Sequence, residues 1–209
     1  MNITEIRDLP IAGAKLIFFS RYQDNRGYFT ETYRKTDFLA LARALGLDGF
    51  DFQQANESRS VAGVIRGLHF QHDPPMGKLI RLLYGSGVDM ALDVRPSSAT
   101  RGKAIMVDMA VDPSSPEGHW IWLPPGLAHG NFYLAPSAIE YFCNAPYNPA
   151  GEVGISPLDP DLDLSLCPEG LRRAYRDLLA EGPILSDKDK KGLSLRDWWA
   201  DPRAGRLAG

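Results

Sequence analysis

Short apolar runs interrupted by turn residues are the dominant pattern along this chain. The segment Val88–Val94 alternates between apolar and polar residues, which predicts a strand with one face on a core. Glycine and proline are spread throughout and separate such runs. Further strands are predicted at Ala14–Ser20, Gly27–Tyr33, Ser60–Phe70, Gly77–Tyr84, Lys103–Met109, Gly118–Leu123, His129–Tyr133 and Ile139–Cys143. Many short strands with frequent turns indicate an all-β sandwich or barrel.

Helical periodicity is confined to two segments, Thr36–Leu45 and Leu171–Ala180. No repeat or low-complexity linker divides the chain, so we expect a single domain over residues 1–209. Its helices would lie before the main sheet and in a C-terminal helical region at about residues 168–200. The tail from Ala200 is expected to pack only loosely on the rest of the domain.

Composition narrows the range of partners and locations. The chain carries 23 basic and 26 acidic side chains without a Lys/Arg cluster, so nucleic acid is not expected as a partner. Cys143 and Cys167 are too few for a disulfide scaffold and fit a reducing compartment. No apolar stretch approaches the length of a membrane span, and the N-terminal segment lacks the features of a signal peptide. These features predict a soluble, cytoplasmic protein.

The predicted strand around Gly67 holds two polar candidates, Arg66 and His69. In a regular strand these side chains point to opposite faces, so a bulge or twist near Gly67 is required for both to face one cavity. A hairpin would bring the strand that begins at Lys78 back beside His69, placing a base and a cation in one pocket. Taken singly, a strand histidine is more often a hydrogen-bonded core residue, and a strand-end lysine is more often solvated.

A Pro-x-Gly turn followed by a strand histidine, Pro124–His129, is similar to the second motif of the cupin superfamily. Metal cupins supply a His-x-His pair and a glutamate from their first motif. Here Gln71 stands two residues after His69, and the nearby His72 does not restore the pair. We therefore predict a site without a metal.

Two later segments add candidate chemistry. Tyr141 is a weak acid that keeps its proton in water and can protonate a carbanion, although strand aromatics are also common in cores. The segment Leu185–Asp189 by itself is typical of a charged surface turn.

Taken together, these segments resemble the dTDP-4-dehydrorhamnose 3,5-epimerase family. The resemblance runs in a single order from roughly residue 3 to residue 195, and an ordered series of motifs is far stronger than any one of them. The matching segments are Asp24–Glu31 (D-x-R-G-x-F-x-E), Gln54–Ser58 (Q-x-N-x-S), Arg66–Gln71 (R-G-L-H-F-Q), Lys78–Ile80, Asp93–Arg95, Pro124–Gly130, Tyr141 with Tyr147, Glu152, and Leu185–Asp189 (L-S-x-K-D).

The resemblance implies roles for individual residues. His69 matches the catalytic base, Asp189 the acid group that orients it, Lys78 the cation beside the sugar C4 oxygen, and Tyr141 the acid on the opposite face. Substrate-binding roles are implied for Arg26, Glu31, Gln54, Asn56, Arg66, His129 and the pocket tyrosine Tyr147, and for Tyr22, which would stack on the base from the partner subunit.

The family implies a fold, an assembly and a reaction. We expect an all-β, cupin-type jelly-roll barrel with a few short flanking helices. We expect a homodimer that exchanges N-terminal strands, about residues 1–35. The implied reaction inverts C3 and/or C5 of a nucleotide-linked 4-keto-6-deoxy sugar of the dTDP-4-keto-6-deoxyglucose type, without a cofactor. The 4-keto group acidifies both neighbouring C–H bonds, because the carbanion left behind is an enolate.

Three alternatives stay open at this point. They are a single-carbon epimerase acting on another nucleotide-linked 4-keto sugar, a metal-dependent cupin, and a non-catalytic sugar-nucleotide binding protein. Three positions depart from the family pattern and bear on which sugar and nucleotide bind. Asn131 replaces an aromatic residue, Met76 lies in an altered segment before Gly77, and Phe142 replaces a lysine.

Overall fold

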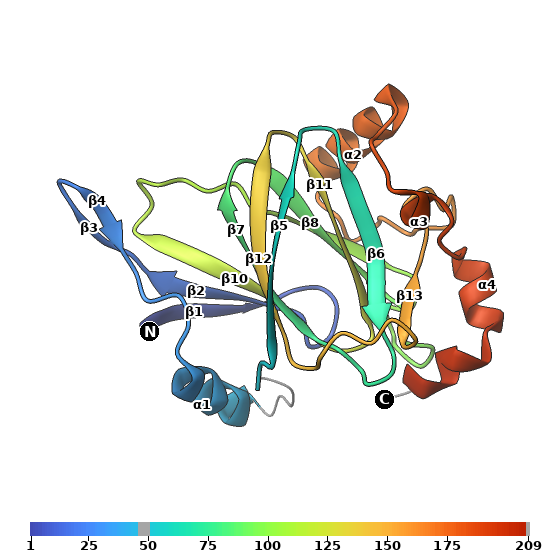
Figure 1. The fold of residues 1–209 in the computed structure, drawn as a ribbon, viewed down its shortest axis with the longest axis horizontal. Helices are drawn as coiled ribbons and strands as arrows, with labels where there is room; N and C mark the ends of the chain where they lie inside the picture. The colour runs from blue at the N-terminus through green and yellow to red at the C-terminus, as the bar shows by residue number, and fades with distance from the viewer. Residues whose placement is uncertain (46–50, 208–209) are drawn as a thin grey trace.

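Two antiparallel β-sheets lie face to face and form the body of the protein (Figure 1). The computed structural model describes residues 1–45 and 51–207. One sheet has six strands in the order β1-β2-β10-β7-β12-β5. Its strands are β1 (Ile3–Asp8), β2 (Lys15–Ser20), β10 (Glu117–Leu123), β7 (Lys78–Tyr84), β12 (Ser137–Cys143) and β5 (Gln54–Ser60).

The second sheet has five strands in the order β13-β6-β11-β8-β9. Its strands are β13 (Glu152–Gly154), β6 (Ile65–Gln71), β11 (Leu127–Tyr133), β8 (Gly87–Asp93) and β9 (Ala104–Asp108). A separate hairpin of β3 (Tyr22–Asp24) and β4 (Gly27–Phe29) projects away from the body (Figure 1). The all-β prediction is confirmed.

Helices cover the outer face of each sheet. Helix α1 (Lys35–Leu45) packs Phe38 against Trp120 and Trp122 of the six-stranded sheet. The five-stranded sheet is covered by the C-terminal region, which contains α2 (Glu169–Glu181), α3 (Asp187–Lys190), α4 (Leu195–Ala200) and a 3-10 helix at Pro202–Leu207. No helix in the described ranges is long and apolar enough to cross a bilayer.

This cover changes the interpretation of the central strands. All seven residues of β8 and all seven of β11 are buried. The alternation at Val88–Val94 predicted one face on a core, but both faces are buried, and it is the apolar face of Val88, Met90 and Leu92 that lies under the C-terminal region. The inner face meets the opposite sheet through Ile80, Ile121 and Ile139.

The prediction of a loosely held tail from Ala200 is wrong. Ala204 and Leu207 are buried, with 5% and 6% of their surface exposed. The indole Nε1 of Trp198 donates to the carbonyl of Val94 at 3.0 Å, and its ring packs on Phe70. The C-terminal region is therefore part of the core rather than an appendage.

Most predicted strands are confirmed with shifted ends, but four strands were missed. The predicted strand Ser60–Phe70 starts too early, because β5 ends at Ser60 and a turn with a left-handed Gly63 (φ +82°) precedes β6. Strand β5 was overlooked because its sequence, QANESRS, is polar on both faces. Strands β1, β3 and β13 were also overlooked, and the predicted strand Gly27–Tyr33 ends at Phe29.

The bulge predicted near Gly67 is present. Strands β6 and β11 pair His69 with His129 and Arg66 with Asn131, so β6 has one extra residue between the two pairs. Gly67 adopts φ +112°, and a Cβ atom there would lie 2.6 Å from the Cα of Gly130. Only glycine fits this backbone approach.

The predicted hairpin between the His69 and Lys78 strands is wrong. Strand β6 belongs to the five-stranded sheet, and β7 lies in the interior of the six-stranded sheet. Residues 72–77 therefore cross from one sheet to the other instead of closing a two-stranded turn. His69 and Lys78 meet across the space between the sheets.

We expect Gly67→Ala to lower the free energy of unfolding by about 2 kcal/mol, because alanine is strained at this φ and its methyl group meets the β11 backbone. Gly170→Ala in α2 is the matched control. Its added methyl group meets nothing within 4 Å, and we expect a gain of about 0.5 kcal/mol. Urea denaturation measures both. Equal stability of Gly67→Ala and wild type would contradict the close approach of β6 and β11.

Candidate active site

Two adjoining cavities open between the sheets, with volumes of about 300 Å³ and 310 Å³. His69, Lys78 and Tyr141 line both, so these side chains stand where the cavities meet. His69 comes from the five-stranded sheet, whereas Lys78 and Tyr141 come from the six-stranded sheet. A flat ring held at this point would have the imidazole on one side and the phenol on the other.

The imidazole of His69 is held by Asp189. Its Nε2 atom lies 2.7 Å from Oδ1 of Asp189, and both atoms are shielded from solvent. A carboxylate that close to Nε2 stabilises the tautomer with its proton on that nitrogen. The other nitrogen, Nδ1, is then left with a lone pair, as a general base requires.

Helix α3 positions the Asp189 carboxylate. Ser186 caps this helix by accepting from the backbone N–H of Asp189 at 3.1 Å, and its hydroxyl donates to Oδ2 of Asp189 at 2.7 Å. Burial alone would raise the pKa of Asp189, but its contacts with His69 and Ser186 outweigh burial and lower that pKa. The carboxylate is therefore charged when the site is at neutral pH.

Lys78 reaches across the cavity from the start of β7. Its Nζ donates to the backbone carbonyl of His69 at 3.2 Å. Burial lowers the pKa of Lys78, and the weaker fields of Cys143, Glu152 and Asp89 oppose that shift. An ammonium group with so little solvent interacts strongly with any negative charge that develops beside it.

Tyr141 lies on β12, and its ring centre is 6.3 Å from that of His129. Burial raises the pKa of Tyr141, followed by the field of Cys143, while Arg66 partly opposes the shift. The phenol therefore keeps its proton at neutral pH and can act as an acid.

The structure brings together five of the eight predicted substrate-binding residues. Arg66 and His129 line the cavity beside Asp189, whereas Gln54, Asn56 and Tyr147 line the other cavity. Arg66 is held by Ser60, to which its Nε donates at 2.9 Å. These side chains extend the site well beyond the central residues, as a long substrate would need.

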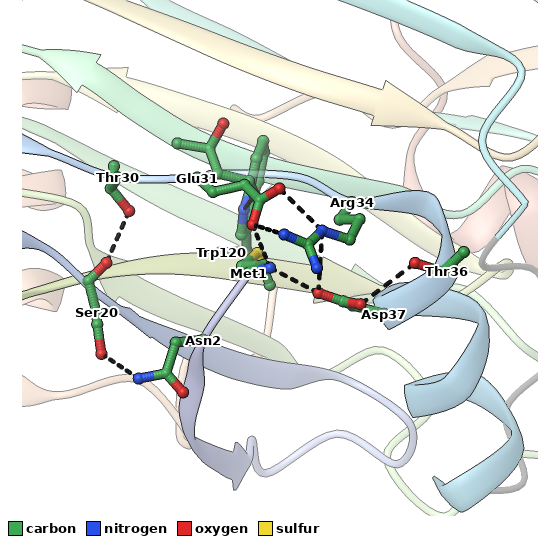
Figure 2. Close-up of polar contacts among 10 residues, drawn as sticks. Met1, Asn2, Ser20, Thr30, Glu31, Arg34, Thr36, Asp37 and Trp120 are labelled. Carbon is green, nitrogen blue, oxygen red and sulfur yellow. Dashed lines mark hydrogen bonds and ion pairs between the residues drawn. The ribbon is translucent and has the colours of Figure 1, made fainter.

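The other three predicted binding residues lie outside both cavities of the single chain. Tyr22 is 57% exposed on the projecting hairpin, and Arg26 there pairs with Asp24 at 2.6 Å. Figure 2 shows Glu31 held by the backbone amine of Met1 and by Arg34, whose Nε donates at 2.9 Å. No binding role for these residues follows from one chain alone.

Two acidic residues at the site had no role assigned from the sequence, although Glu152 belongs to the matched segments. Glu152 on β13 accepts from the Tyr147 hydroxyl at 2.8 Å and forms an ion pair with Lys188. Burial opposes ionisation of Glu152, but Lys188 and Tyr147 lower its pKa overall. Asp89, which bonds His129, was also missed. Its acidic side chain within an otherwise apolar central strand was the available signal.

The three departures from the family pattern lie in different places. Met76 and Asn131 line the cavities. Phe142 instead points to the outer face of its sheet, with its ring 4.9 Å from that of Tyr33. The sequence interpretation that Phe142 bears on the sugar pocket is therefore wrong.

The histidines do not assemble into a three-ligand site. His72 is buried beside the C-terminal region, and burial, followed by the field of Arg203, lowers its pKa. Gln71 donates to the carbonyl of Pro74 at 2.9 Å and accepts from the backbone N–H of Asn148 at 2.7 Å. Within residues 1–45 and 51–207 no group of three His, Cys, Asp or Glu side chains could hold a metal.

We expect Lys78 to lose its proton at a lower pH than the other lysines, because burial is the largest influence on its pKa and favours the neutral amine. Protein labelled with ¹³C-lysine reports each titration through its Cε chemical shift. Lys78→Met assigns the signal by removing it. A Lys78 signal that titrates with the exposed lysines, near about pH 10.4, would show that the ammonium is solvated.

Comparison with known proteins identifies a family for this chain. The family model described as dTDP-4-dehydrorhamnose 3,5-epimerase matches residues 8–197. A dTDP-4-dehydrorhamnose 3,5-epimerase from Methanothermobacter thermautotrophicus is 37% identical over 186 residues, which cover 88% of this chain and 91% of that protein.

Solved structures agree with this relationship. The Legionella pneumophila dTDP-6-deoxy-D-glucose-3,5-epimerase, in complex with dTDP-4-keto-L-rhamnose, superposes with a TM-score of 0.76 at 33% identity, over 92% of this chain and 93% of that chain. A 3'-monoepimerase from Streptomyces bikiniensis, in complex with dTDP-quinovose, gives 0.72 at 27% identity, over 95% and 98%. The predicted cupin-type jelly roll is confirmed. The chain belongs to the dTDP-4-dehydrorhamnose 3,5-epimerase family.

Proposed function

We propose that this protein inverts C3 and C5 of a nucleotide-linked 4-keto-6-deoxy sugar of the dTDP-4-keto-6-deoxyglucose type. The observation that carries the proposal is the position of His69 and Tyr141 on opposite sheets, facing one space that Lys78 also lines. The Legionella relative, whose complex contains a dTDP-linked 4-keto sugar, supports the choice of substrate class.

The first step is removal of a proton next to the keto group. Nδ1 of His69 takes that proton, and the electron pair of the C–H bond moves into a C=C bond while the C4 oxygen becomes negative. Asp189, 2.7 Å from Nε2, stabilises the imidazolium that forms. Lys78 stabilises the negative oxygen, a contribution of about 3 kcal/mol in a water-excluded site.

The second step returns a proton to the other face of the ring. The Tyr141 hydroxyl donates it to the carbon, the enolate collapses to the ketone, and the configuration is inverted. The raised pKa of Tyr141 matters here, because the phenol has to retain its proton until the carbanion needs it. In both steps the proton moves between the sugar carbon and a protein side chain.

We further propose a homodimer in which the β3–β4 hairpin completes the partner's site. Tyr22 and Phe29 on this hairpin are 57% and 71% exposed, which is unusual for aromatic side chains in a monomer. Strand β1 pairs with β2, and β2 pairs with β10 of the same chain, so exchange of residues 1–35 remains a prediction. Both cysteines are free and buried, which supports a cytoplasmic location.

The reaction predicts distinct isotope results for the base and the acid. His69→Asn should lower exchange of solvent deuterium into dTDP-4-keto-6-deoxyglucose about a hundredfold or more, because the group that takes the proton is removed. Tyr141→Phe should keep exchange yet lose inversion. Both are followed by ¹H NMR in D₂O. Wild-type exchange in His69→Asn would refute the base assignment, and normal inversion by Tyr141→Phe would refute the acid.

The same spectra separate the double epimerase from a single-carbon enzyme. Deuterium at both C3 and C5 of the product, each with inverted configuration, is the expected result. Label and inversion at one carbon would instead favour the activity named for the Streptomyces bikiniensis relative.

Subunit complementation tests the hairpin. We expect Arg26→Ala and His69→Ala homodimers each to be nearly inactive, because each lacks one part of every site. Mixed dimers would contain one complete site, so refolding the two variants together should restore about a quarter of wild-type activity if subunits pair at random. Failure to recover activity from dimers shown to be mixed would mean that each chain uses its own Arg26.

A further inference from the structure

A second histidine–aspartate pair lies beside the proposed catalytic pair, and the reaction above does not use it. His129 on β11 is the cross-strand partner of His69 on β6. Its Nε2 lies 2.7 Å from Oδ2 of Asp89 on β8. The side chains of His129 and Asp89 are 7% and 1% exposed. A buried carboxylate is costly, so its partners define its role.

Asn131 and Tyr133 fix the direction of the hydrogen bonds around Asp89. The Tyr133 hydroxyl donates to Oδ1 of Asn131 at 3.2 Å, and burial raises the pKa of Tyr133, so this donor keeps its proton. The carbonyl side of the Asn131 amide therefore faces Tyr133. Its NH₂ side faces Asp89, with Nδ2 3.1 Å from Oδ2.

This arrangement determines which ring nitrogen of His129 carries a proton. Nδ2 of Asn131 also lies 3.1 Å from Nε2 of His129, but the shorter contact of Nε2, at 2.7 Å, is with Asp89. Asp89 offers only lone pairs, which a bare Nε2 would face with its own lone pair. Nε2 therefore holds the proton and donates it to Asp89. Burial lowers the pKa of His129 more than the field of Asp89 raises it, so the ring carries no second proton at neutral pH.

The remaining nitrogen, Nδ1, is an acceptor with no donor among the residues that the structure describes. His129 lines the cavity together with His69, Lys78 and Tyr141. A lone pair in that position favours a ligand group that brings its own proton. A sugar hydroxyl does so, whereas a diphosphate at neutral pH offers only acceptor oxygens.

We propose that Asp89 is a positioning residue that fixes His129 in its Nε2–H tautomer, so that Nδ1 accepts a hydrogen bond from a ring hydroxyl of the bound sugar. The proposal rests on the proposed function for the identity of that sugar. A 4-keto-6-deoxyhexose linked through C1 keeps free hydroxyls at C2 and C3 only. His129 is thereby assigned to the sugar rather than to the diphosphate, and the cavity selects against deoxy analogues at one of these carbons.

The tautomer is tested in the free protein, without substrate. Long-range ¹H–¹⁵N NMR of ¹⁵N-histidine protein should show His129 protonated on Nε2 and bare on Nδ1 between about pH 6 and 8. Asp89→Asn should shift the proton toward Nδ1, because the new amide donates to Nε2. Asp189→Asn is the matched control and should alter the His69 signals only. A His129 ring protonated on Nδ1 in wild type would overturn the proposal.

The hydroxyl contact is tested with a substrate cycle. Wild type should prefer dTDP-4-keto-6-deoxyglucose over its 2-deoxy or its 3-deoxy analogue by about tenfold in kcat/KM, measured as deuterium exchange at C5, for the loss of one hydrogen bond. In His129→Phe that preference should fall to about threefold or less. If neither analogue is disfavoured, or if His129→Phe keeps the wild-type preference, His129 does not accept a hydrogen bond from a sugar hydroxyl.

Folding of the variants is controlled separately. Removing one member of a buried charged pair leaves the other uncompensated, so Asp89→Leu combined with His129→Phe replaces both by apolar groups if the single variant does not fold. If the wild type acts on none of the 4-keto sugars, the proposed function is wrong, but the measured tautomer of His129 still stands. If the wild type is active but its preference for the hydroxylated substrate does not depend on His129, only this inference is wrong.

Discussion

The close approach of Gly67 to Gly130 is the constraint on which the site depends. At this point β6 takes an extra residue, and the absence of a side chain on both strands lets their backbones come together. Without that extra residue the strand alternation would send Arg66 and His69 to opposite faces. Because of it, the guanidinium and the imidazole enter the same cavity. The positions of the reactive side chains on the five-stranded sheet therefore depend on the backbone geometry at Gly67.

The opposing sheet supplies groups of complementary character. Lys78 and Tyr141 are held on interior strands whose neighbours on both sides fix their backbone. Burial raises the pKa of the Tyr141 phenol, which keeps its proton for the proposed acid role. Burial lowers the pKa of the Lys78 amine, and it also excludes the water that would screen the charge of the ammonium form. The two histidines on the facing sheet, each paired with an aspartate, differ in their exposure to solvent. His69 is 24% exposed, whereas His129 is 7% exposed and more isolated from solvent.

Local sequence patterns predicted those parts of the structure that depend on local physics. Apolar runs located most strands, and the glycine within β6 predicted its bulge. The hairpin to Lys78 failed because a short turn-like segment at residues 72–77 does not reveal whether it joins neighbours in one sheet or crosses between two. Strand β5 was missed because its inward side chains are polar, as a cavity wall requires. Asp89 was missed because its importance comes from long-range contacts with His129 and Asn131.

Strand β5 forms one wall of the cavities while lying at the edge of its sheet, paired only with β12. Its side chains alternate strictly, with Gln54, Asn56 and Ser58 turned toward the cavities and the residues between them exposed. None of these inward residues belongs to an apolar core cluster, so changing them costs little packing energy. Substrate range in this scaffold is therefore open to evolution, or to directed libraries, through a single peripheral strand, while the proton-transfer machinery on the interior strands stays intact.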